Sequence, residues 1–234
     1  MAVDSELIER ARKLRPGAVG DLLQTQAASV YRISYALAGR WDVGRGIARF
    51  VLNRSVKMMP KWDRNDDPEN WFHRFTVMTS RRSARHQPAA KKDVLVEQAL
   101  APDQPYIAFV SALRQLDYQP REAFLLRHGE KLNARYSALA MDCSTEAADN
   151  HLKVAEGSLR LVAGARYDGL VAKMVDAYSH LTPEPDQLLP SVNRVVLRKV
   201  VVRRWIRWIW IALQLAVVAG VCWGVWHFWR MIQT

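Results

Sequence analysis

The residues of this chain that could do chemistry are mainly cations and large aromatic side chains rather than catalytic groups. Its six histidines show no H-x-x-x-H or H-E-x-x-H spacing, Cys143 and Cys222 lie far apart, and no glycine-rich phosphate loop is present. We therefore expect no catalytic residues, no cofactor and no metal site, so the chain is not predicted to be an enzyme. Its 34 Lys/Arg against 23 Asp/Glu give a net charge of +11, which favours an anionic partner such as nucleic acid or a membrane surface.

The first concentration of positive charge lies in residues 1–100, which carry 18 Lys/Arg against 11 Asp/Glu. Six cations form a stripe toward the end of a predicted helix: Arg74, Arg81, Arg82, Arg85, Lys91 and Lys92. Such a stripe can bind DNA phosphates, although a solvated helix face has the same composition. Four aromatic residues lie close by, and their spacing predicts core positions or, for one or two of them, contact with an unstacked base: Trp62, Trp71, Phe72 and Phe75.

The second concentration of positive charge precedes the most apolar part of the chain. The uncharged run 208–229 has 22 residues, which is enough for one helix to cross the ~30 Å hydrocarbon layer of a membrane. Tryptophans at both ends match the aromatic belts of membrane helices. A buried core helix is the alternative, but such helices are usually shorter and lack paired aromatic ends. The predicted anchor residues are Trp205, Arg207, Trp208, Trp210, Trp223, Trp226 and Trp229.

The charges that flank this run predict its orientation. Six cations lie between Arg194 and Arg207, before the run, and only Arg230 follows it. The positive-inside rule therefore places the preceding 200 residues in the cytoplasm and makes the lipid bilayer a partner of the chain. We expect a single-pass protein held by this helix.

The rest of the chain is predicted to be all-α, because its apolar residues recur at spacings of three and four and no sustained alternation appears. Proline and glycine divide this pattern into helices, and the prolines of TPEPDQLLP are expected to prevent a continuous helix before the membrane. The predicted organisation is two helical modules at 1–87 and 106–181, a linker at 88–105, a proline-punctuated basic segment at 182–207 and the membrane helix at 208–229.

Two segments carry family motifs. DPENWFHRFTVMTSRRSAR contains a Pro-x-x-Trp-aromatic signature at Pro68, Trp71 and Phe72, and ALRQLDYQPREAFLLRHGEKL contains Pro-Arg-Glu before an apolar run. These segments resemble regions 2 and 4 of the extracytoplasmic-function sigma-70 factors, which give bacterial RNA polymerase its promoter specificity. The resemblance covers about residues 20–160. It implies core RNA polymerase and promoter DNA as partners, a regulatory protein partner, and a place at the bacterial inner membrane.

The resemblance also implies DNA-binding residues in both modules. In the first module they are Trp71, Arg74, Arg81, Arg82 and Arg85. The second module has helix-turn-helix proportions, with Ser144 as the predicted N-cap of the second helix. Its candidates are Ser144, Asn150, His151 and Lys153, unless the helix-turn-helix geometry serves packing only.

The chain departs from the family at positions that matter for function. Gly44, Arg45 and Ala48 stand where an acidic pair and a glutamine are usual on the polymerase-binding helix, and Asp149 lies where cations usually meet DNA. We therefore expect a sigma-factor-like protein of transcription initiation or its control, with weak promoter binding by the second module. The alternative is a membrane interaction protein or scaffold that has the sigma fold but does not bind promoters.

Overall fold

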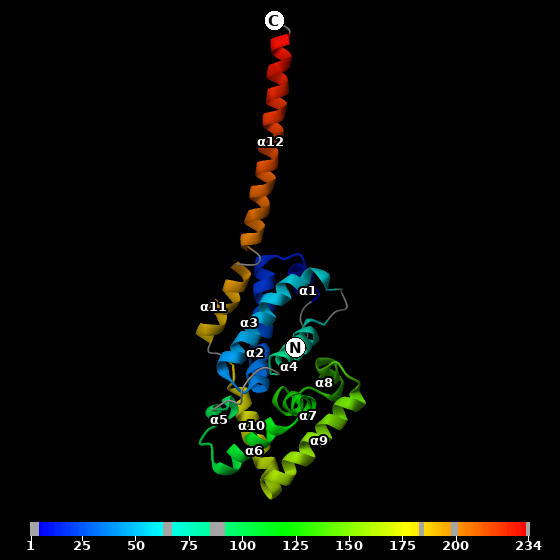
Figure 1. Cartoon of the computed structure of the whole chain (residues 1–234), viewed down its shortest axis with the longest axis vertical. Helices are drawn as coiled ribbons and strands as arrows, with labels where there is room; N and C mark the ends of the chain where they lie inside the picture. Colours follow the sequence, from blue (N-terminus) through cyan, green and yellow to red (C-terminus); the bar gives the residue numbers. More distant parts are fainter. Residues whose placement is uncertain (1–4, 63–66, 85–91, 183–184, 198–200, 233–234) are drawn as a thin grey trace.

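The computed structural model describes residues 5–62, 67–84, 92–182, 185–197 and 201–232. All regular elements within these ranges are helical and none is a strand, which confirms the predicted all-α class. Most of the helices form one body, and the long helix α12 (Val202–Ile232) projects from one end of it (Figure 1).

The first half of the body is built around a long buried helix. Its elements are α1 (Ser5–Arg12), α2 (Pro16–Ala38), α3 (Trp41–Met58), the 3₁₀ turn η1 (Met59–Lys61) and α4 (Pro68–Ala84). Helix α2 begins at Pro16, where a proline loses no hydrogen bond, and is followed by Gly39 at φ 68°, which donates its N–H to the Tyr35 carbonyl oxygen. Helices α1, α3 and α4 all pack against α2, so α2 positions the rest of this half.

Helices α2 and α3 cross at a very short distance. A Cβ atom on Gly44 would lie 2.5 Å from Tyr35 Cδ1 and 2.8 Å from Tyr35 Cα. Ala48, one turn later, is fully buried. Helices α2 and α3 therefore touch at Gly44, where a longer side chain would clash with Tyr35.

The second half follows the sequence prediction closely. Its elements are α5 (Val94–Gln98), α6 (Gln104–Gln115), α7 (Tyr118–Phe124), the π turn η2 (Leu125–Gly129), α8 (Ala134–Met141), α9 (Thr145–Ala163), the 3₁₀ turn η3 (Gly164–Arg166) and α10 (Tyr167–Ser179). Helices α8 and α9 form the expected helix-turn-helix pair, with Asp142 in a left-handed conformation (φ 59°) at the turn. Ser144 caps α9, since its hydroxyl accepts the Ala147 N–H at 3.1 Å.

Two segments differ from the sequence prediction in their local structure. The segment predicted as a linker contains α5, whose Val94 and Leu95 are fully buried. The segment predicted to be broken by prolines contains α11 (Pro185–Val196), with Pro190 inside the helix. Burial of Val192 and Val195 beside α2 and α3 offsets the hydrogen bond that Pro190 cannot make.

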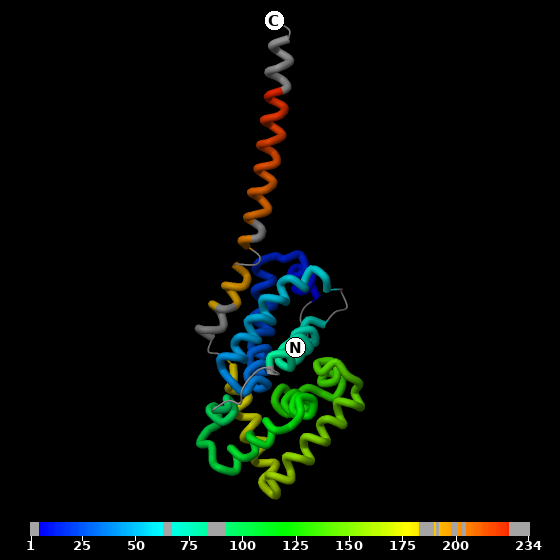
Figure 2. Tube along the Cα trace, viewed as in Figure 1, coloured from blue at the N-terminus to red at the C-terminus, as the bar shows by residue number. Residues whose placement is uncertain are grey.

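The two halves are in contact along the chain trace in Figure 2, where α4 lies beside α7 and α8. Buried residues of both halves belong to one hydrophobic cluster. Ion pairs also join the halves, with Arg32 donating to Glu130 at 2.9 Å and 3.1 Å. The proposed module boundaries stay predictions, but the described parts of both modules pack as one body.

Candidate nucleic-acid interface

A groove of about 610 Å³ lies between α3 and α4 and combines apolar walls with cations. Its apolar lining includes Ile47, Phe50 and Phe75, and its polar lining includes Arg54 and Arg82. Phe50 is 55% exposed although it is a large apolar residue. An exposed aromatic face between two cations is a suitable surface for an unstacked base and its flanking phosphates.

Stacked aromatic rings continue from this groove into the core. The Phe50 and Phe75 rings lie 6.1 Å apart at 20°, and the Phe75 and Trp71 rings lie 4.9 Å apart at 19°. Trp62 and Phe72 form the buried end of this cluster. The core positions expected for Trp62 and Phe72 are therefore observed, whereas Phe75 lines the groove and Trp71 stacks behind it.

The contribution of α3 to this groove was not predicted from the sequence. Gly46, Phe50 and Arg54 follow one another at intervals of four, so they share one face of a helix. That spacing could have identified an exposed aromatic residue beside a cation. It could not have shown that α4 supplies the opposite wall.

The predicted cations of α4 fall into different environments. Arg82 is exposed and lines the groove. Arg74, which is half exposed, forms an ion pair with Asp142 of the helix-turn-helix at 2.8 Å. Arg85, together with Lys91, lies outside the described residues. Among the described cations of α4, Arg82 is therefore the best placed for a phosphate.

Arg81 is held by a carboxylate of the second half. Its Nε and Nη2 atoms donate to the two Glu122 oxygens at 3.0 Å and 2.5 Å, and Nη2 also lies 3.4 Å from the Met141 carbonyl oxygen. Glu122 is 2% exposed, and its burial raises the pKa of the carboxyl group while Arg81 opposes that shift. The Arg81 guanidinium thus joins α4 to α7 within the body.

The predicted DNA-binding residues of the second module also lie in different environments. Asn150 and Lys153 are exposed on α9, and Ser144 uses its hydroxyl in the N-cap. His151 is partly buried and lies close enough to Glu122 to influence the pKa of that carboxyl group. Asp149 is exposed beside Asn150, so the outer face of this turn carries an anion as well as candidate DNA contacts.

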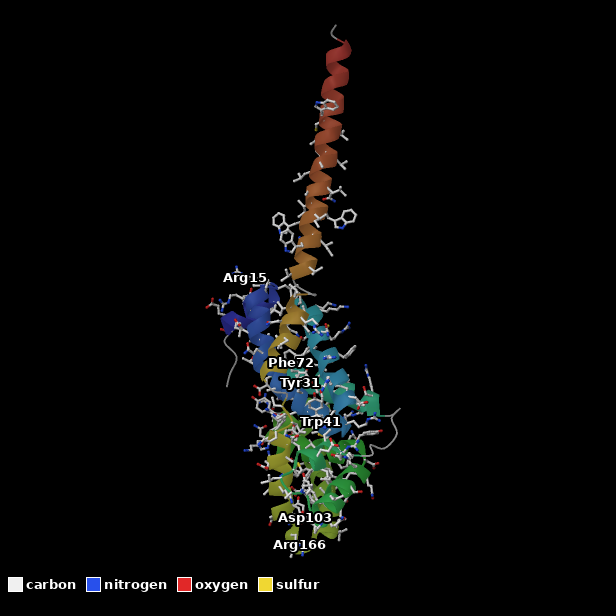
Figure 3. All side chains as sticks on the ribbon, turned by 90° about the vertical axis from the view of Figure 1, so that its left-hand side faces the viewer. Arg15, Tyr31, Trp41, Phe72, Asp103 and Arg166 are labelled. Atoms are coloured by element: carbon white, nitrogen blue, oxygen red, sulfur yellow. The ribbon has the colours of Figure 1, made fainter. Side chains whose placement is uncertain are left out.

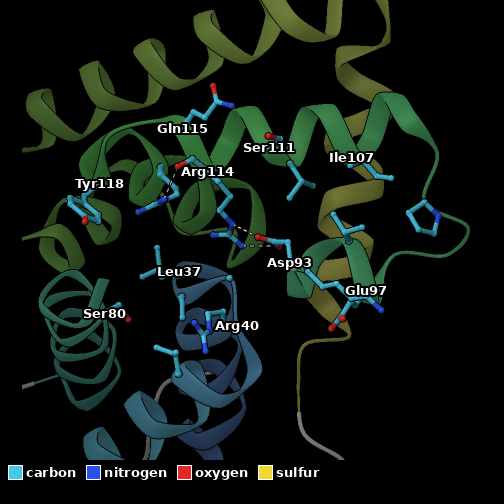
Figure 4. A pocket seen from close by; sticks show the side chains of 18 of the residues that line it. Leu37, Arg40, Ser80, Asp93, Glu97, Ile107, Ser111, Arg114, Gln115 and Tyr118 are labelled. Carbon is cyan, nitrogen blue, oxygen red and sulfur yellow. Dashed lines mark hydrogen bonds and ion pairs between the residues drawn. The ribbon is translucent and has the colours of Figure 1, made fainter. Parts of the chain in front are cut away.

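A larger cavity, of about 940 Å³, lies where the two halves meet (Figure 4). Arg114 lines this cavity and makes three hydrogen bonds there. Its Nε and Nη2 atoms donate to Asp93 at 2.5 Å and 3.0 Å, and its Nη1 atom donates to the Ala36 carbonyl oxygen. Arg121 lies near Arg114, and burial lowers the pKa of Arg121. The Arg114 contacts hold α5 and α6 against the end of α2.

Helix α12 is exposed over its apolar length. The segment Trp205–Gly224 has a mean hydropathy of 1.7, and none of it is buried within the protein. Trp205, Trp208 and Trp210 are 60–67% exposed near its beginning. Helix α12 leaves the body at the end that Arg15 marks in Figure 3. Arg207 and Trp223 are also exposed, and the side chains of Trp226 and Trp229 lie outside the described residues. Within the part of the chain that the structure describes, one helix is thus long and apolar enough to span a membrane.

Comparison with known proteins identifies the fold. No family model and no curated protein matches the chain. Among solved structures, the chain is similar to the extracytoplasmic-function sigma factor CnrH in complex with the cytosolic domain of CnrY, with a TM-score of 0.56 and 17% identity over 69% of this chain and 97% of CnrH. It also matches the sigma factor RpoE in complex with the anti-sigma factor NepR from Bartonella quintana, with a TM-score of 0.47 and 14% identity over 61% of this chain and 94% of RpoE.

The similarity to CnrH agrees with one expectation from the sequence. The helical fold of CnrH matches the one that the motifs at Pro68 and Pro120 imply. This chain therefore has the fold of an extracytoplasmic-function sigma factor.

Proposed function

We propose that this chain is a membrane-tethered, sigma-factor-like regulator of transcription initiation that binds core RNA polymerase and promoter DNA. The observation that carries the proposal is the fold shared with CnrH over nearly the whole of that protein. Because CnrH is bound by a partner protein, we also infer a regulatory protein partner for this chain.

DNA binding is assigned to the α3–α4 groove. Phe50 and Phe75 offer aromatic faces to an unstacked base, and Arg54 and Arg82 lie on the same groove for the phosphates. The second module contributes less, since Asp149 is exposed beside Asn150 and repels the DNA backbone. Trp71 stacks on Phe75 and does not itself line the groove. Arg74 is paired with Asp142 and does not line it either.

Polymerase binding is assigned to α3, the helix that resembles the polymerase-binding helix of the family. Its exposed residues include Arg45 and Arg49, so the charge of this surface is opposite to the acidic one usual in sigma factors. The matching surface on polymerase is then acidic or apolar. We therefore predict that this chain binds polymerase at a site different from that of sigma factors with acidic α3 residues. Those sigma factors should then compete with it poorly.

The membrane assignment rests on α12 and its flanking charges. Its exposed apolar surface would be unfavourable in water, and in a bilayer the same side chains face lipid. We place the body in the cytoplasm and α12 across the bacterial inner membrane as a single-pass anchor. The cations before Trp208 favour this orientation.

One observation favours the second candidate function, a scaffold without promoter binding. Arg74 and Arg81 are both paired with carboxylates of the second half, at Asp142 and Glu122. In this closed arrangement two of the predicted DNA-binding cations are already neutralised.

A pull-down of core RNA polymerase by the purified full chain tests the proposal. The chain is solubilised in detergent and immobilised, and polymerase capture is compared with that of an Arg45→Glu/Arg49→Glu variant. We expect the parent chain to capture polymerase and the variant to lose most of that capture. Equal capture by the parent chain and the variant, with folded bodies shown by circular dichroism, would contradict the assignment of polymerase binding to α3.

A further inference from the structure

Helix α11 lies along both α2 and α3 and buries one face on them. Val192 is 2% exposed and Val195 is 7% exposed, whereas Asn193 and Arg194 on the other face are exposed. Near the end of the helix, Val196 Cγ2 lies 4.0 Å from the position of a Cβ atom on Gly20. The α2–α3 surface is therefore an apolar docking site that a segment of the same chain occupies.

The occupied surface includes part of α3, the helix to which we assign polymerase binding, so this inference rests on the proposed function. A protein that approaches α2 and α3 from the side covered by α11 must displace it. We propose that α11 is an internal competitor of core RNA polymerase for the α2–α3 surface. Binding of polymerase and docking of α11 then exclude each other.

The backbone of α11 lacks one of the hydrogen bonds that hold a helix together, because Pro190 lies inside it. Helices α1, α3 and α4 contact α2 directly. Release of α11 would therefore leave these contacts in place.

The position of α11 in the chain connects it to the anchor. Only residues 197–201 separate its last residue from α12. Val201, Trp205 and Trp208 line a pocket of about 410 Å³ with Pro16, the first residue of α2. A movement of α12 relative to the body would thus act on the end of the α2–α11 contact where Gly20 and Val196 meet, so the state of the membrane helix can set how long α11 stays docked.

The test compares two double variants of the full chain in lipid nanodiscs. Val192→Asp/Val195→Asp places carboxylates on the buried face of α11, and Asn193→Asp/Leu197→Asp places the same charges on exposed positions of the same segment. Hydrogen exchange of residues 185–196 reports docking, and titration with core RNA polymerase reports binding. We expect the first variant to lose protection of α11 by at least about 100-fold, because a carboxylate is not tolerated in an apolar contact. Its affinity for polymerase should rise by about ten-fold or more, and the control should match the parent chain in both measurements.

A reversible cross-link provides the reciprocal test without disturbing the core. Gly20→Cys/Val196→Cys, with Cys143 and Cys222 replaced by serine, should form a disulfide that fixes α11 on α2. Oxidation should abolish polymerase binding and a thiol reductant should restore it.

Two outcomes overturn the inference in distinguishable ways. If α11 is released in the Asp variant while polymerase affinity stays at the parent value, α11 does not compete and the proposed function stands. If neither the parent chain nor the released variant binds polymerase, although hydrogen exchange shows that α2 and α3 remain protected, the proposed function fails and the competition fails with it.

Discussion

Arg81 shows how a single residue can change its apparent role once its partner is known. Its charge and its place at the basic end of α4 suggested a phosphate contact, but its guanidinium forms two hydrogen bonds with Glu122, which lies 41 residues away. Arg81→Ala should destabilise the protein by about 2–4 kcal/mol, because it leaves a buried carboxylate without its cation. Arg82→Ala, on the exposed groove, should change stability by no more than about 0.5 kcal/mol.

Urea denaturation of the two variants at pH 7.5, followed by circular dichroism in detergent micelles, measures this difference. Equal effects of the two substitutions would show that the Arg81–Glu122 pair contributes nothing to the contact between the halves.

His73 makes stability depend on pH at the contact between α2 and α4. It is 2% exposed, its Nε2 lies 2.9 Å from Ser29 Oγ, and its Nδ1 has no hydrogen-bond partner among the described groups. Burial lowers its pKa from 6.5, partly opposed by Glu130, Glu69 and Asp67 and reinforced by Arg32. The stability due to neutral His73 is therefore complete above pH 6.5 and is lost as the pH falls, because the unfolded chain then binds a proton that the folded chain does not.

The contribution of His73 to the slope of unfolding free energy against pH should be positive below pH 6.5, and for one proton its upper limit is about 1.4 kcal/mol per pH unit. His73→Asn should flatten the slope in that window, and His180→Asn, at an exposed position, should leave it unchanged. A slope that is the same in all three proteins would rule out His73 as its source.

At the scale of elements, we predict that the α3–α4 groove binds single-stranded DNA. Phe50→Ala should weaken binding of a single-stranded oligonucleotide by about ten-fold, in line with roughly 1–3 kcal/mol for each stacked base. Tyr136→Ala removes an aromatic ring that is also exposed, on α8, and should have no effect. Fluorescence anisotropy of a labelled oligonucleotide gives both affinities, and equal losses would place the bases elsewhere.

The elements also show what sequence patterns can and cannot predict. The start of α9 was predicted from Ser144 as its N-cap and is observed at Thr145, because the Ser144 side chain accepts the Ala147 N–H. Helix α11 was not predicted, because a proline at position 190 disfavours a helix in the local sequence. The burial of Val192 and Val195 against α2 and α3, which stabilises the helix, depends on the fold and could not be predicted from the local sequence. The pairing of Arg74 with Asp142 was equally invisible, because it depends on how the two halves meet.

The α3–α4 groove was partly visible in the sequence. Trp71, Phe75 and Arg82 drew attention through their residue types, and Phe50 and Arg54 share a helical face with each other. The sequence did not show that α3 and α4 pack against each other. Local patterns therefore predicted most elements, whereas the site required contacts between distant residues.

At the scale of the whole molecule, the orientation of α12 can be measured directly. A reporter fused after Thr234 should lie outside the cytoplasm, because six cations precede the apolar run and one follows it. Alkaline phosphatase, which is active only outside the cytoplasm, should be active in this fusion. Replacing Arg203, Arg204 and Arg207 by glutamate should reduce that activity, whereas a phosphatase that is inactive in the parent fusion would reverse the proposed topology.

The whole molecule combines a body with the sigma-factor fold, a helix docked on that body and an exposed apolar helix that continues from it. In the proposed function, the anchor holds the body near the membrane and the docked helix limits its access to polymerase. Both features make the parent chain a weak activator and the released Val192→Asp/Val195→Asp variant a strong one.

Sequencing the 5′ ends of transcripts made in vitro tests the proposed function most directly. Core RNA polymerase transcribes fragmented genomic DNA alone, with the parent chain in nanodiscs, and with the released variant in nanodiscs. We predict new start sites that share an upstream sequence in the two reactions that contain the chain, several-fold more abundant with the released variant. The same start sites with and without the chain, in both its forms, would contradict the proposal that this sigma-like fold directs transcription initiation.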